Sequence, residues 1–581
     1  MSAEKLITDH IDIWTSAVQA KPASGRGSSK KRELYGIKKL RELILELAVR
    51  GKLVPQNPND EPASVLLERI AAEKAQLVKE KKIKKPKALP KISNEKPFSV
   101  PESWTWTQLG FVTNYGVCEK AESKDVQDST WVLELEDVEK STSKLLRKVR
   151  FEDRSFKSSK NVFLKKDVIY GKLRPYLDKV IVADEAGVCT TEMIPMRGYC
   201  DFSPEFLRLV LKTPYFIEYA NSSTHGMNLP RMGTDKAREA LIPLVPINEQ
   251  HRIVAKVDEL MALCDQLEHQ TEASLDAHQV LVETLLATLT NSQDATELKA
   301  NWASISEHFD TLFTTEQSID QLKQTILQLA VTGKLVPQDP NDEPAAKLLE
   351  RIAEEKAQLV KEKKIKKQKA LPPIAEDEKP FELPNGWEWC RLDDICQGIT
   401  SGSTPPKSNF QELPGIPYLK VYNIRNQLID FEYNPQFIDI ECHSSKLARS
   451  VLYPGDVVMN IVGPPLGKIA LIPDRYPEWN CNQAITFFRP IEPSLNRYIY
   501  TYLTAGIFLD SIELIGTAGQ DNISVTKSRS IVLPTPPLEE QSRIVRKVND
   551  LLEICEQLKQ RLRDSQQTQL QLTDTIVEQA L

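Results

Sequence analysis

The stretch Leu40–Ile92 reads LRELILELAVRGKLVPQNPNDEPASVLLERIAAEKAQLVKEKKIKKPKALPKI, and it returns at Leu322–Ile374 as LKQTILQLAVTGKLVPQDPNDEPAAKLLERIAEEKAQLVKEKKIKKQKALPPI. About 42 of the 53 positions are identical, at a constant offset of about 282 residues. Solenoid repeats have periods of roughly 20–50 residues, so a spacing this long indicates a duplicated domain. The rest of the chain is therefore expected to fall into two equivalent halves.

Each copy of the repeat carries two helical patterns. In the first copy, apolar residues keep helical spacing over 33–50, and Gly51 is expected to end that helix in the left-handed conformation. The loop PQNPNDEP leads into a second predicted helix over 63–85, whose end carries a run of lysines. Before the repeat, residues 1–20 are compatible with a short helix, and Lys21–Arg32 has the composition of a flexible linker.

A long helical pattern closes each half. Apolar residues of EQHRIVAKVDELMALCDQLEHQ recur at alternating spacings of four and three, which is the seam of a coiled coil. The same pattern recurs about 291 residues later, near the C-terminus. The predicted seam has a structural role and consists of Ile253, Val257, Leu260, Cys264 and Leu267 in the first helix, and of Ile544, Val548, Leu551, Cys555 and Leu558 in the second.

Two strand-rich segments alternate with the helical parts. They match each other far less well than the helices do, but KDVIYGKLRPYLDKVIV (Lys166–Val182) still aligns with GDVVMNIVGPPLGKIAL (Gly455–Leu471). They are expected to be one fold carrying two different surfaces. The predicted class is α+β, in the order 1–95 helical extension with the first repeat, 96–247 first globular α/β domain, 248–290 central long helix, 291–378 helical region with the second repeat, 379–537 second globular α/β domain and 538–581 C-terminal long helix.

The composition favours a cytosolic protein of several domains. The chain has 581 residues, of which 41% are hydrophobic and 27% charged. No apolar run approaches the roughly 18 residues of a membrane span, and MSAEKLITDH lacks the apolar core of a signal peptide. Nine Cys without a CxxC pair indicate neither a disulfide framework nor a zinc site. The net charge of −6 argues against a globally basic nucleic-acid binder but leaves room for local basic surfaces.

Catalytic signatures are missing from the sequence. GKLV at Gly51 and Gly333 lacks the first glycine and the hydroxyl residue of a phosphate loop, and no HExxH or GxSxG motif occurs. Pro464-Pro465 is not preceded by Asn or Asp, as an amino-methyltransferase motif would require, and no glycine-rich loop suits an adenosyl cofactor. A non-catalytic chain without its own cofactor or metal is expected.

The candidate DNA-binding residues are cationic and polar side chains on loops between strands. Arg forms bidentate hydrogen bonds with guanine, Asn and Gln suit adenine, and Lys neutralises phosphate. In the first globular domain the candidates are Lys172, Arg174, Tyr176 and Lys179 of GKLRPYLDK, and Asn228, Arg231 and Lys236 of STHGMNLPRMGTDK. In the second domain they are Lys420, Arg425, Lys468, Gln520, Asn522 and Lys527.

Each candidate has a plainer interpretation. GKLRPYLDK is equally compatible with a solvated hairpin edge whose charges deter strand pairing, and the Asn-rich loops with ordinary turns. The lysine runs are typical of solvated helix ends, although two copies could flank one duplex and hold its backbone. The lysines considered for phosphate contacts are Lys82, Lys84, Lys85, Lys364, Lys366 and Lys367.

The chain as a whole resembles a known family. Two dissimilar domains alternating with near-identical repeats, LAVRGKLVPQ, YGKLRPY, and the junction PLVPINEQHRIVAKVDEL with its echo PTPPLEEQSRIVRKVNDL are similar to the specificity subunit of type I restriction-modification systems. The long N-terminal extension and the PNDEPA repeat resemble the type IB branch.

The resemblance implies two target recognition domains, each reading one half of a bipartite sequence in double-stranded DNA. An antiparallel coiled coil would hold them apart. Two modification subunits would bring S-adenosylmethionine and methyl transfer, and restriction subunits would bring ATP, Mg²⁺ and cleavage, in a bacterial or archaeal cytoplasm without a membrane partner. The sequence leaves one alternative open, a free-standing bivalent DNA-binding regulator, although the acidic net charge counts against it. A coiled-coil scaffold without a DNA role is disfavoured, because the strand-rich domains are large and unlike each other.

The duplication also predicts where the ends of the chain lie. Tandem copies generate pseudo-twofold symmetry, as dimers generate true symmetry. For that symmetry to close, the C-terminal helix must continue geometrically into the N-terminal helix. We therefore expect the two termini close together, with the helix over Glu33–Arg50 beside the helix over Ser542–Leu581.

Overall fold

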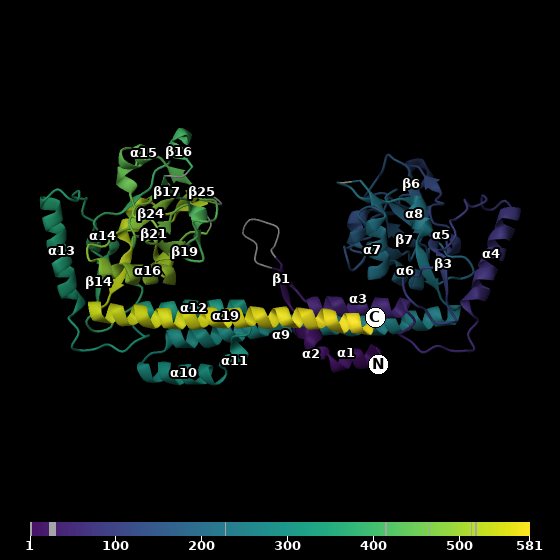
Figure 1. Ribbon diagram of the computed structural model, residues 1–581, viewed down its shortest axis with the longest axis horizontal. Coiled ribbons are helices and arrows are strands. Elements are labelled where there is room, and N and C mark those ends of the chain that lie inside the picture. Colours follow the sequence, from purple (N-terminus) through teal and green to yellow (C-terminus); the bar gives the residue numbers. More distant parts are fainter. Residues whose placement is uncertain are drawn as a thin grey trace. The chain divides into compact units, whose positions relative to one another are not determined.

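The computed structural model describes residues 3–21, 31–226, 228–412, 415–463, 465–512, 514–517 and 520–581. The chain forms two compact units (Figure 1). Unit 1 comprises the described residues up to Ser274 together with Ser565–Leu581, and unit 2 comprises Leu275–Asp564. Among the described residues, no helix is long and apolar enough to cross a membrane.

The N-terminal part of unit 1 consists of short elements followed by the first repeat helix. The elements are α1 (Ala3–Asp9), α2 (Ile11–Ser16), the paired strands β1 (Gln19–Lys21) and β2 (Lys31–Glu33), and α3 (Tyr35–Val49). Most of the linker expected at Lys21–Arg32 lies outside the described residues, while its two ends belong to β1 and β2. Unit 2 has the second repeat helix at α12 (Glu316–Val331).

The glycine predicted to end the first repeat helix has that role. Arg50 caps the end of α3 and still has helical geometry, and Gly51 follows with φ +70°. A Cβ atom there would lie 2.4 Å from the Pro101 ring, so the position excludes other residues sterically as well. Gly333, with φ +71°, occupies the same place after α12.

The second helix of each repeat is shorter than predicted. The prediction of a helix over 63–85 is wrong at its end, because α4 spans Ala63–Lys79 and its copy α13 spans Ala345–Lys361. Lys81 has a left-handed backbone, φ 57°, and Lys363 has φ 58°. Pro86 does not cause the early end of α4, because α13 ends at the equivalent residue although Gln368 stands in place of Pro86. A helix continued through the lysine run would place like charges three and four residues apart.

The long helices α9 (Ile247–Asn291) and α19 (Leu538–Ala580) contribute residues to both units. The predicted seam residues of α9 are all buried, and those of α19 are buried or half-buried. The segment between α9 and α12 in unit 2 contains α10 (Ala295–Glu307) and α11 (Phe309–Leu312). One apolar cluster in unit 2 joins α9, α12 and α19 through residues that include Leu286, Leu322 and Cys555.

Hydrogen bonds and ion pairs give the direction of each helix within unit 1. Arg41 of α3 contacts Asp265 and Glu268 of α9 at 2.7 and 2.6 Å, while Gln56, further along the chain, contacts the earlier Glu249. The repeat therefore runs antiparallel to α9. Tyr35 donates to Asp574 at 2.7 Å and Lys52 to the carbonyl of Leu581 at 2.7 Å, so α3 runs parallel to the end of α19.

In unit 2 the two long helices exchange these roles. Lys323 of α12 contacts Glu556 at 2.5 Å, and the earlier Asp320 contacts the later Lys559, so α12 is antiparallel to α19. Gln321 contacts Glu283, and the later Lys334 contacts the carbonyl of Thr290, so α12 is parallel to α9. It follows that α9 and α19 are antiparallel within this unit.

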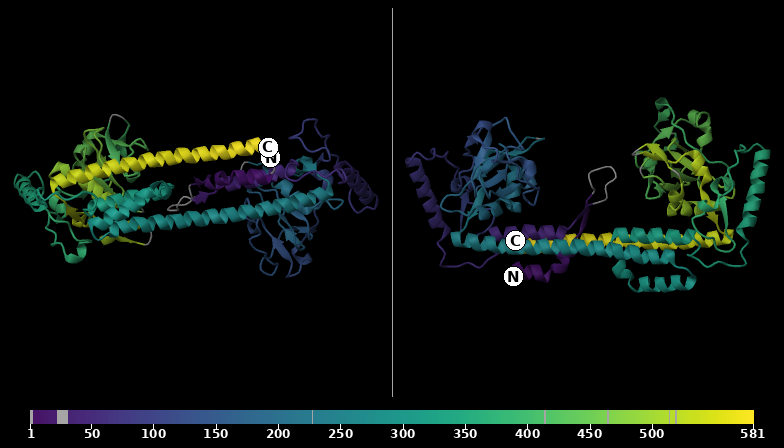
Figure 2. Two further views of the ribbon diagram at one scale, coloured as in Figure 1. Left: turned by 90° about the horizontal axis from the view of Figure 1, so that it is seen from below. Right: turned by 180° about the vertical axis from the view of Figure 1, so that it is seen from behind.

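The end of α19 lies beside α3, as the duplication predicts, and α1 packs on α3 as well (Figure 2).

The first globular domain is built from small, mostly antiparallel sheets and short helices. Its sheets are β4–β6–β9–β5, β10–β7–β8, β13–β3 and the hairpin β11–β12. The strands are β3 (Thr105–Gln108), β4 (Lys120–Ala121), β5 (Trp131–Leu133), β6 (Lys160–Phe163), β7 (Val168–Gly171), β8 (Val180–Val182), β9 (Gly187–Cys189), β10 (Met193–Met196), β11 (Thr224–His225), β12 (Arg231–Met232) and β13 (Leu241–Leu244). The helices are α5 (Leu109–Val112), α6 (Pro204–Leu211), α7 (Pro214–Ser222) and α8 (Thr234–Glu239).

The second globular domain repeats the plan with more strands. Its sheets are β15–β24–β21–β22, β16–β20–β17–β23, β14–β27, β18–β19 and β25–β26. The strands are β14 (Glu388–Arg391), β15 (Thr400–Ser401), β16 (Phe410–Gln411), β17 (Ile416–Leu419), β18 (Ile424–Arg425), β19 (Leu428–Ile429), β20 (Phe437–Ile438), β21 (Val457–Asn460), β22 (Ile469–Leu471), β23 (Asn480–Cys481), β24 (Ile485–Phe488), β25 (Ile515–Thr517), β26 (Gln520–Asn522) and β27 (Val532–Thr535). The helices are α14 (Leu392–Ile395), α15 (Ile440–Ser444), α16 (Asn496–Ala505), α17 (Phe508–Ser511) and α18 (Val525–Ser530).

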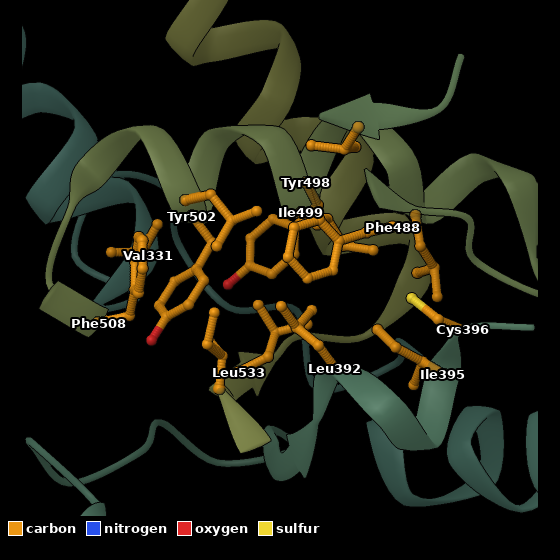
Figure 3. Close-up of a cluster of buried hydrophobic side chains, with 14 of the residues drawn as sticks. Val331, Leu392, Ile395, Cys396, Phe488, Tyr498, Ile499, Tyr502, Phe508 and Leu533 are labelled. Atoms are coloured by element: carbon orange, nitrogen blue, oxygen red, sulfur yellow. The ribbon is translucent and has the colours of Figure 1, made fainter. Parts of the chain in front are cut away.

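The largest core cluster of the second domain extends into the repeat. Figure 3 shows Val331 of α12 beside Phe508, with Tyr498 and Tyr502 of α16 above Leu533 of β27. All of these side chains are at most 2% exposed. Because one continuous core includes both domain and repeat, the domain is fixed to the repeat helix within this unit.

Candidate nucleic-acid interface

In the first domain, the two loops singled out from the sequence lie against each other. Residues 172–179 connect the antiparallel strands β7 and β8, and the described residues 224–226 and 228–232 contain the hairpin β11–β12. Leu173 pairs with Arg231 in an isolated β-bridge. The backbone N–H of Arg174 donates to the carbonyl of Pro230 at 2.7 Å. We call these two segments the paired-loop surface of the first domain.

The second domain builds an equivalent surface. Residues 461–468 connect β21 to β22, and β25–β26 forms the hairpin. Val462 pairs with Asn522, and the N–H of Gly463 donates to the carbonyl of Asp521 at 3.0 Å. The described residues of these segments form the paired-loop surface of the second domain. The side chain of Gln520 lies outside the described residues, so its predicted role stays a prediction.

Arg174 has an unusual backbone. Its φ is 50°, in the left-handed region that side chains with a Cβ disfavour, and the equivalent residue of the second domain is Gly463, with φ 78°. The Nη2 of Arg174 donates to the carbonyl of Asn228 at 3.4 Å, while its Nε is buried and has no partner among the described residues. An arginine therefore occupies a position whose backbone favours glycine.

The two lysines of the first loop differ in their side-chain contacts with the rest of the domain. Lys179 donates from Nζ to the carbonyl of Leu135 at 2.6 Å, and burial lowers its pKa. Lys172 is half-buried, and its backbone N–H donates to the carbonyl of Glu192. Tyr176, at the tip of the loop, is 52% exposed. Of these three, Tyr176 presents the most open side chain.

Arg231 is held by a carboxylate that the sequence had not singled out. Its Nε lies 3.1 and 3.0 Å from the two carboxylate oxygens of Glu192. The Asn228 side chain beside it is exposed, whereas Lys236, at the start of α8, pairs with Glu239 at 3.1 Å. The paired-loop surface thus brings Arg174, Asn228 and Arg231 together and leaves Lys236 on the following helix.

The second-domain cations lie on several elements. Arg425 stacks on the Tyr433 ring at 4.2 Å and lies 3.7 Å from Asp430. Its hairpin, β18–β19, packs on β22, next to the paired-loop surface. Lys420 stacks on the Phe410 ring at 5.2 Å. Lys468 and Lys527 are both half-buried.

The lysine runs are exposed and follow α4 and α13. Lys82 pairs with Glu80 at 2.9 Å and Lys364 with Glu362 at 2.8 Å, the same contact in each copy. The remaining candidates make no ion pair within the described parts of the chain, and they are Lys84, Lys85, Lys366 and Lys367. This arrangement is compatible with both solvated ends and phosphate contacts.

An identical set of contacts joins each globular domain to its repeat and long helix. In unit 1 the Glu249 carboxylate of α9 accepts from Trp104 Nε1 at 2.9 Å and from Gln56 at 2.5 Å. Burial raises the pKa of Glu249. The same contacts recur in unit 2, where Glu540 accepts from Trp387 at 3.0 Å and from Gln338 at 3.2 Å. Each globular domain is therefore attached to its repeat and its long helix by equivalent contacts.

Taken together, these features define a protein with two divergent recognition surfaces on one duplicated frame. A model of the type I restriction modification DNA specificity domain matches residues 384–565. The specificity subunits of the Escherichia coli type I restriction enzymes EcoAI and EcoEI are each 44% identical to the chain, with all of this chain and all of each relative covered. One chain from a solved structure on complex assembly and conformational transition of a type I R-M system covers 83% of this chain and 99% of its own length, with a TM-score of 0.51 at 20% identity.

The chain belongs to the specificity subunits of type I restriction-modification systems, and the predicted resemblance, including its type IB branch, is confirmed. It is a non-catalytic subunit that provides DNA target specificity.

Proposed function

We propose that each variable domain reads one half of a bipartite, asymmetric sequence in double-stranded DNA through its paired-loop surface. The observation that carries this proposal is the contrast between the two surfaces. Their backbones pair in the same way, but Arg174 and Arg231 of the first domain correspond to Gly463 and Asn522 of the second. Equivalent frames with different hydrogen-bonding side chains suit the reading of two different base sequences.

The long helices are proposed to set the spacer between the two half-sites. A 45-residue helix such as α9 is about 68 Å long, which exceeds the ~34 Å of one DNA turn. Its buried seam and the antiparallel neighbour in unit 2 would make it a stiff element. The spacer length would then depend on helix length and not on the variable domains.

The repeats are proposed to dock two identical modification subunits. Most exposed residues of α4 recur in α13, including Glu68, Arg69 and Gln76 as Glu350, Arg351 and Gln358, and the exceptions are Ser64, Val65 and Ala72. The long helices provide a comparison within the same chain, because their exposed residues differ between copies while their seams persist. A solvent-facing surface that is largely the same in both copies suits a partner that binds twice.

The remaining chemistry is proposed to reside on partner subunits. Modification subunits would bind S-adenosylmethionine, and restriction subunits would use ATP and Mg²⁺. The assembled complex would act in the cytoplasm of a bacterial or archaeal cell.

The direct test is to express the chain with its modification subunits in a methylation-free host and to sequence the genome for modified bases. We expect one motif made of two unlike, specified half-sites separated by a fixed number of unspecified bases. A single contiguous motif, or methylation without a motif, would contradict the proposal.

Replacing Arg174 by Gly should separate recognition from stability. Because the position has a positive φ, glycine relieves backbone strain, and we expect the free energy of unfolding to change by no more than about 1 kcal/mol. DNA affinity should fall by about 1–3 kcal/mol if the guanidinium reads a base. Competition binding of the assembled methyltransferase to target and scrambled duplexes measures the second quantity.

Lys166→Gly is a matched control for that variant. Lys166 is exposed, has φ 71° and corresponds to Gly455 of the second domain, which has φ 89°. It precedes β7, whereas Arg174 follows that strand. We expect this control to bind DNA as the wild type does, and equal losses in the two variants would remove the base-reading role of Arg174.

A further inference from the structure

We propose that positions 231 and 522 are equivalent base-reading positions, and that Glu192 is the positioning residue that commits Arg231 to guanine. The second domain has no carboxylate at the place of Glu192 and would read adenine with the Asn522 amide. This inference rests on the proposed function and deepens it, because it assigns one base position in each half-site to a named side chain.

The backbone places these four residues in register. Arg231 and Asn522 are the bridge partners of the loops that follow β7 and β21. Glu192 immediately precedes β10, where Met193 pairs with Gly171, and Ala484 immediately precedes β24, where Ile485 pairs with Asn460.

One hydrogen bond is conserved between the copies at this point. The N–H of Lys172 donates to the carbonyl of Glu192 at 3.0 Å, and the N–H of Ile461 donates to the carbonyl of Ala484 at 2.9 Å. Glu192 and Arg231 in one domain therefore stand where Ala484 and Asn522 stand in the other.

The geometry of Arg231 favours a base over a phosphate. Both oxygens of Glu192 engage the Nε edge of the guanidinium, while Nη1 lies 3.4 Å from the carbonyl of Leu229 and Nη2 has no partner among the described residues. The planar group is thus fixed at its Nε edge, and N–H groups of Nη1 and Nη2 remain at its outer end for a ligand. Guanine offers the O6 and N7 acceptors in the matching bidentate arrangement.

The carboxylate itself helps to distinguish the two ligands. An anion at 3 Å repels a DNA phosphate and partly cancels the charge that a phosphate contact would use. Recognition of a neutral base edge needs the orientation of the guanidinium more than its net charge. Glu192 therefore disfavours the phosphate contact and supports the base contact.

In the described part of the second domain, the side chain of Asn522 has no partner equivalent to Glu192. Its Oδ1 is shut off from solvent and has no hydrogen-bond partner among the described residues. Ala484, at the position of Glu192, has no polar side-chain atom that could bond to Asn522. The half-buried side chain would have to turn its Oδ1 outward to accept from N6 of adenine while Nδ2 donates to N7.

Mapping of methylated motifs with the assembled complex tests the assignment. We expect Arg231→Lys to lower methylation of the wild-type target by about 10-fold or more and to relax one guanine in one half-site, because lysine lacks the fork of donors. The other half-site should stay unchanged. Asn522→Ala should relax one adenine in the opposite half-site only.

The Glu192 variants test positioning. Glu192→Gln keeps an acceptor for Nε, and we expect it to retain the guanine preference with a smaller loss than Glu192→Ala. The pair Glu192→Ala with Arg231→Asn installs the side chains of the second domain and should move the preference at that single base toward adenine. The control is Arg150→Ala, which breaks a 2.7 Å ion pair with Glu185 beyond the far end of β8 and should leave the motif intact.

Two outcomes would overturn the inference. A lower melting temperature with an unchanged motif would make Arg231–Glu192 a structural ion pair only. An equal loss of affinity for every sequence would make Arg231 a phosphate contact. A failure of the proposed function looks different, because the wild-type complex itself would then lack a bipartite motif.

Discussion

A chain in which residues 379–537 replace residues 96–246 is expected to methylate a symmetric target. Both recognition surfaces would then be the second one, so the two half-sites should become inverted copies of the second half-site. The original first half-site should disappear completely. This is the largest functional change that we expect from any variant, because a whole half of the specificity is exchanged.

The structure offers a physical reason why such a hybrid should fold. The sequences at both junctions match, EKPF before each domain and EQ with RIV after it. The closing strands also match in register, since Gln108 pairs with Leu241 as Arg391 pairs with Val532. The transplanted Trp387 would find its acceptor in Glu249, because Trp104 donates to that residue in the native chain.

One of the contacts at the new junction that have no counterpart involves a buried carboxylate. Glu46 of α3 accepts from the N–H of Tyr215, a residue that the exchange removes. Arg50, 3.0 Å away, would still pair with Glu46, so the buried carboxylate keeps a partner. We therefore expect a modest loss of stability and no misfolding from this site.

Sequencing of methylated DNA from cells that express the hybrid with modification subunits gives the readout. The reciprocal hybrid, with residues 96–246 in both places, is the matched control and should give inverted copies of the first half-site. Retention of the wild-type asymmetric motif by either hybrid is incompatible with one half-site per domain.

The helical frame was predictable because its signals are local. Spacing alone indicated the seam from Ile253 to Leu267, and all of these residues are buried. The glycine after each repeat helix was recognisable for the same reason. The end of α4 was not, because a left-handed lysine stopped the helix where composition alone permitted it to continue.

The recognition surface depended on contacts that the sequence does not display. Leu173 and Arg231 meet through strand pairing across some 58 residues, so the loops could be selected individually but not joined. Lys179 looked like a free cation, yet its ammonium group bonds to the carbonyl of Leu135. Glu192 could have been found from the sequence. Aligning Cys189 with Cys481 places Glu192 opposite Ala484, so both Glu192 and Arg231 differ between the two copies.

Reciprocal substitutions at Asp137 and Asn423 are expected to give the largest losses of stability. The two residues occupy equivalent turns of the two domains. The side chain of each accepts a hydrogen bond from the backbone N–H three residues earlier, at 2.8 and 2.9 Å. Asp137 is fully buried and bonds to Arg147 at 2.7 Å and to Arg154 at 2.9 Å. Asn423 instead donates to the carbonyl of Tyr433 at 2.9 Å.

Asp137→Asn should destabilise the first domain by about 3–5 kcal/mol, because Arg147 and Arg154 lose a buried carboxylate and Arg154 keeps only the carboxylate of Glu136, at 3.2 Å. Asn423→Asp should cost the second domain a similar amount, since the new carboxylate would face backbone carbonyls. Hydrogen exchange of peptides around each turn, with urea unfolding of the whole chain, measures both effects. Wild-type exchange at these turns would refute the expectation.

The pH dependence should have opposite signs in the two cases. Burial alone would raise the pKa of Asp137, but hydrogen bonds from Arg154, Arg147 and the backbone outweigh it and hold the pKa below its usual value. The stability from Asp137 is therefore complete above the unfolded pKa of about 3.8 and is lost as pH falls through the folded pKa. Asp137→Asn should remove this acid-side loss. In Asn423→Asp, burial without a cationic partner should raise the carboxyl pKa, so acidification toward that pKa should restore stability. Equivalent turns would then be stabilised by a buried charge in one domain and by a neutral amide in the other.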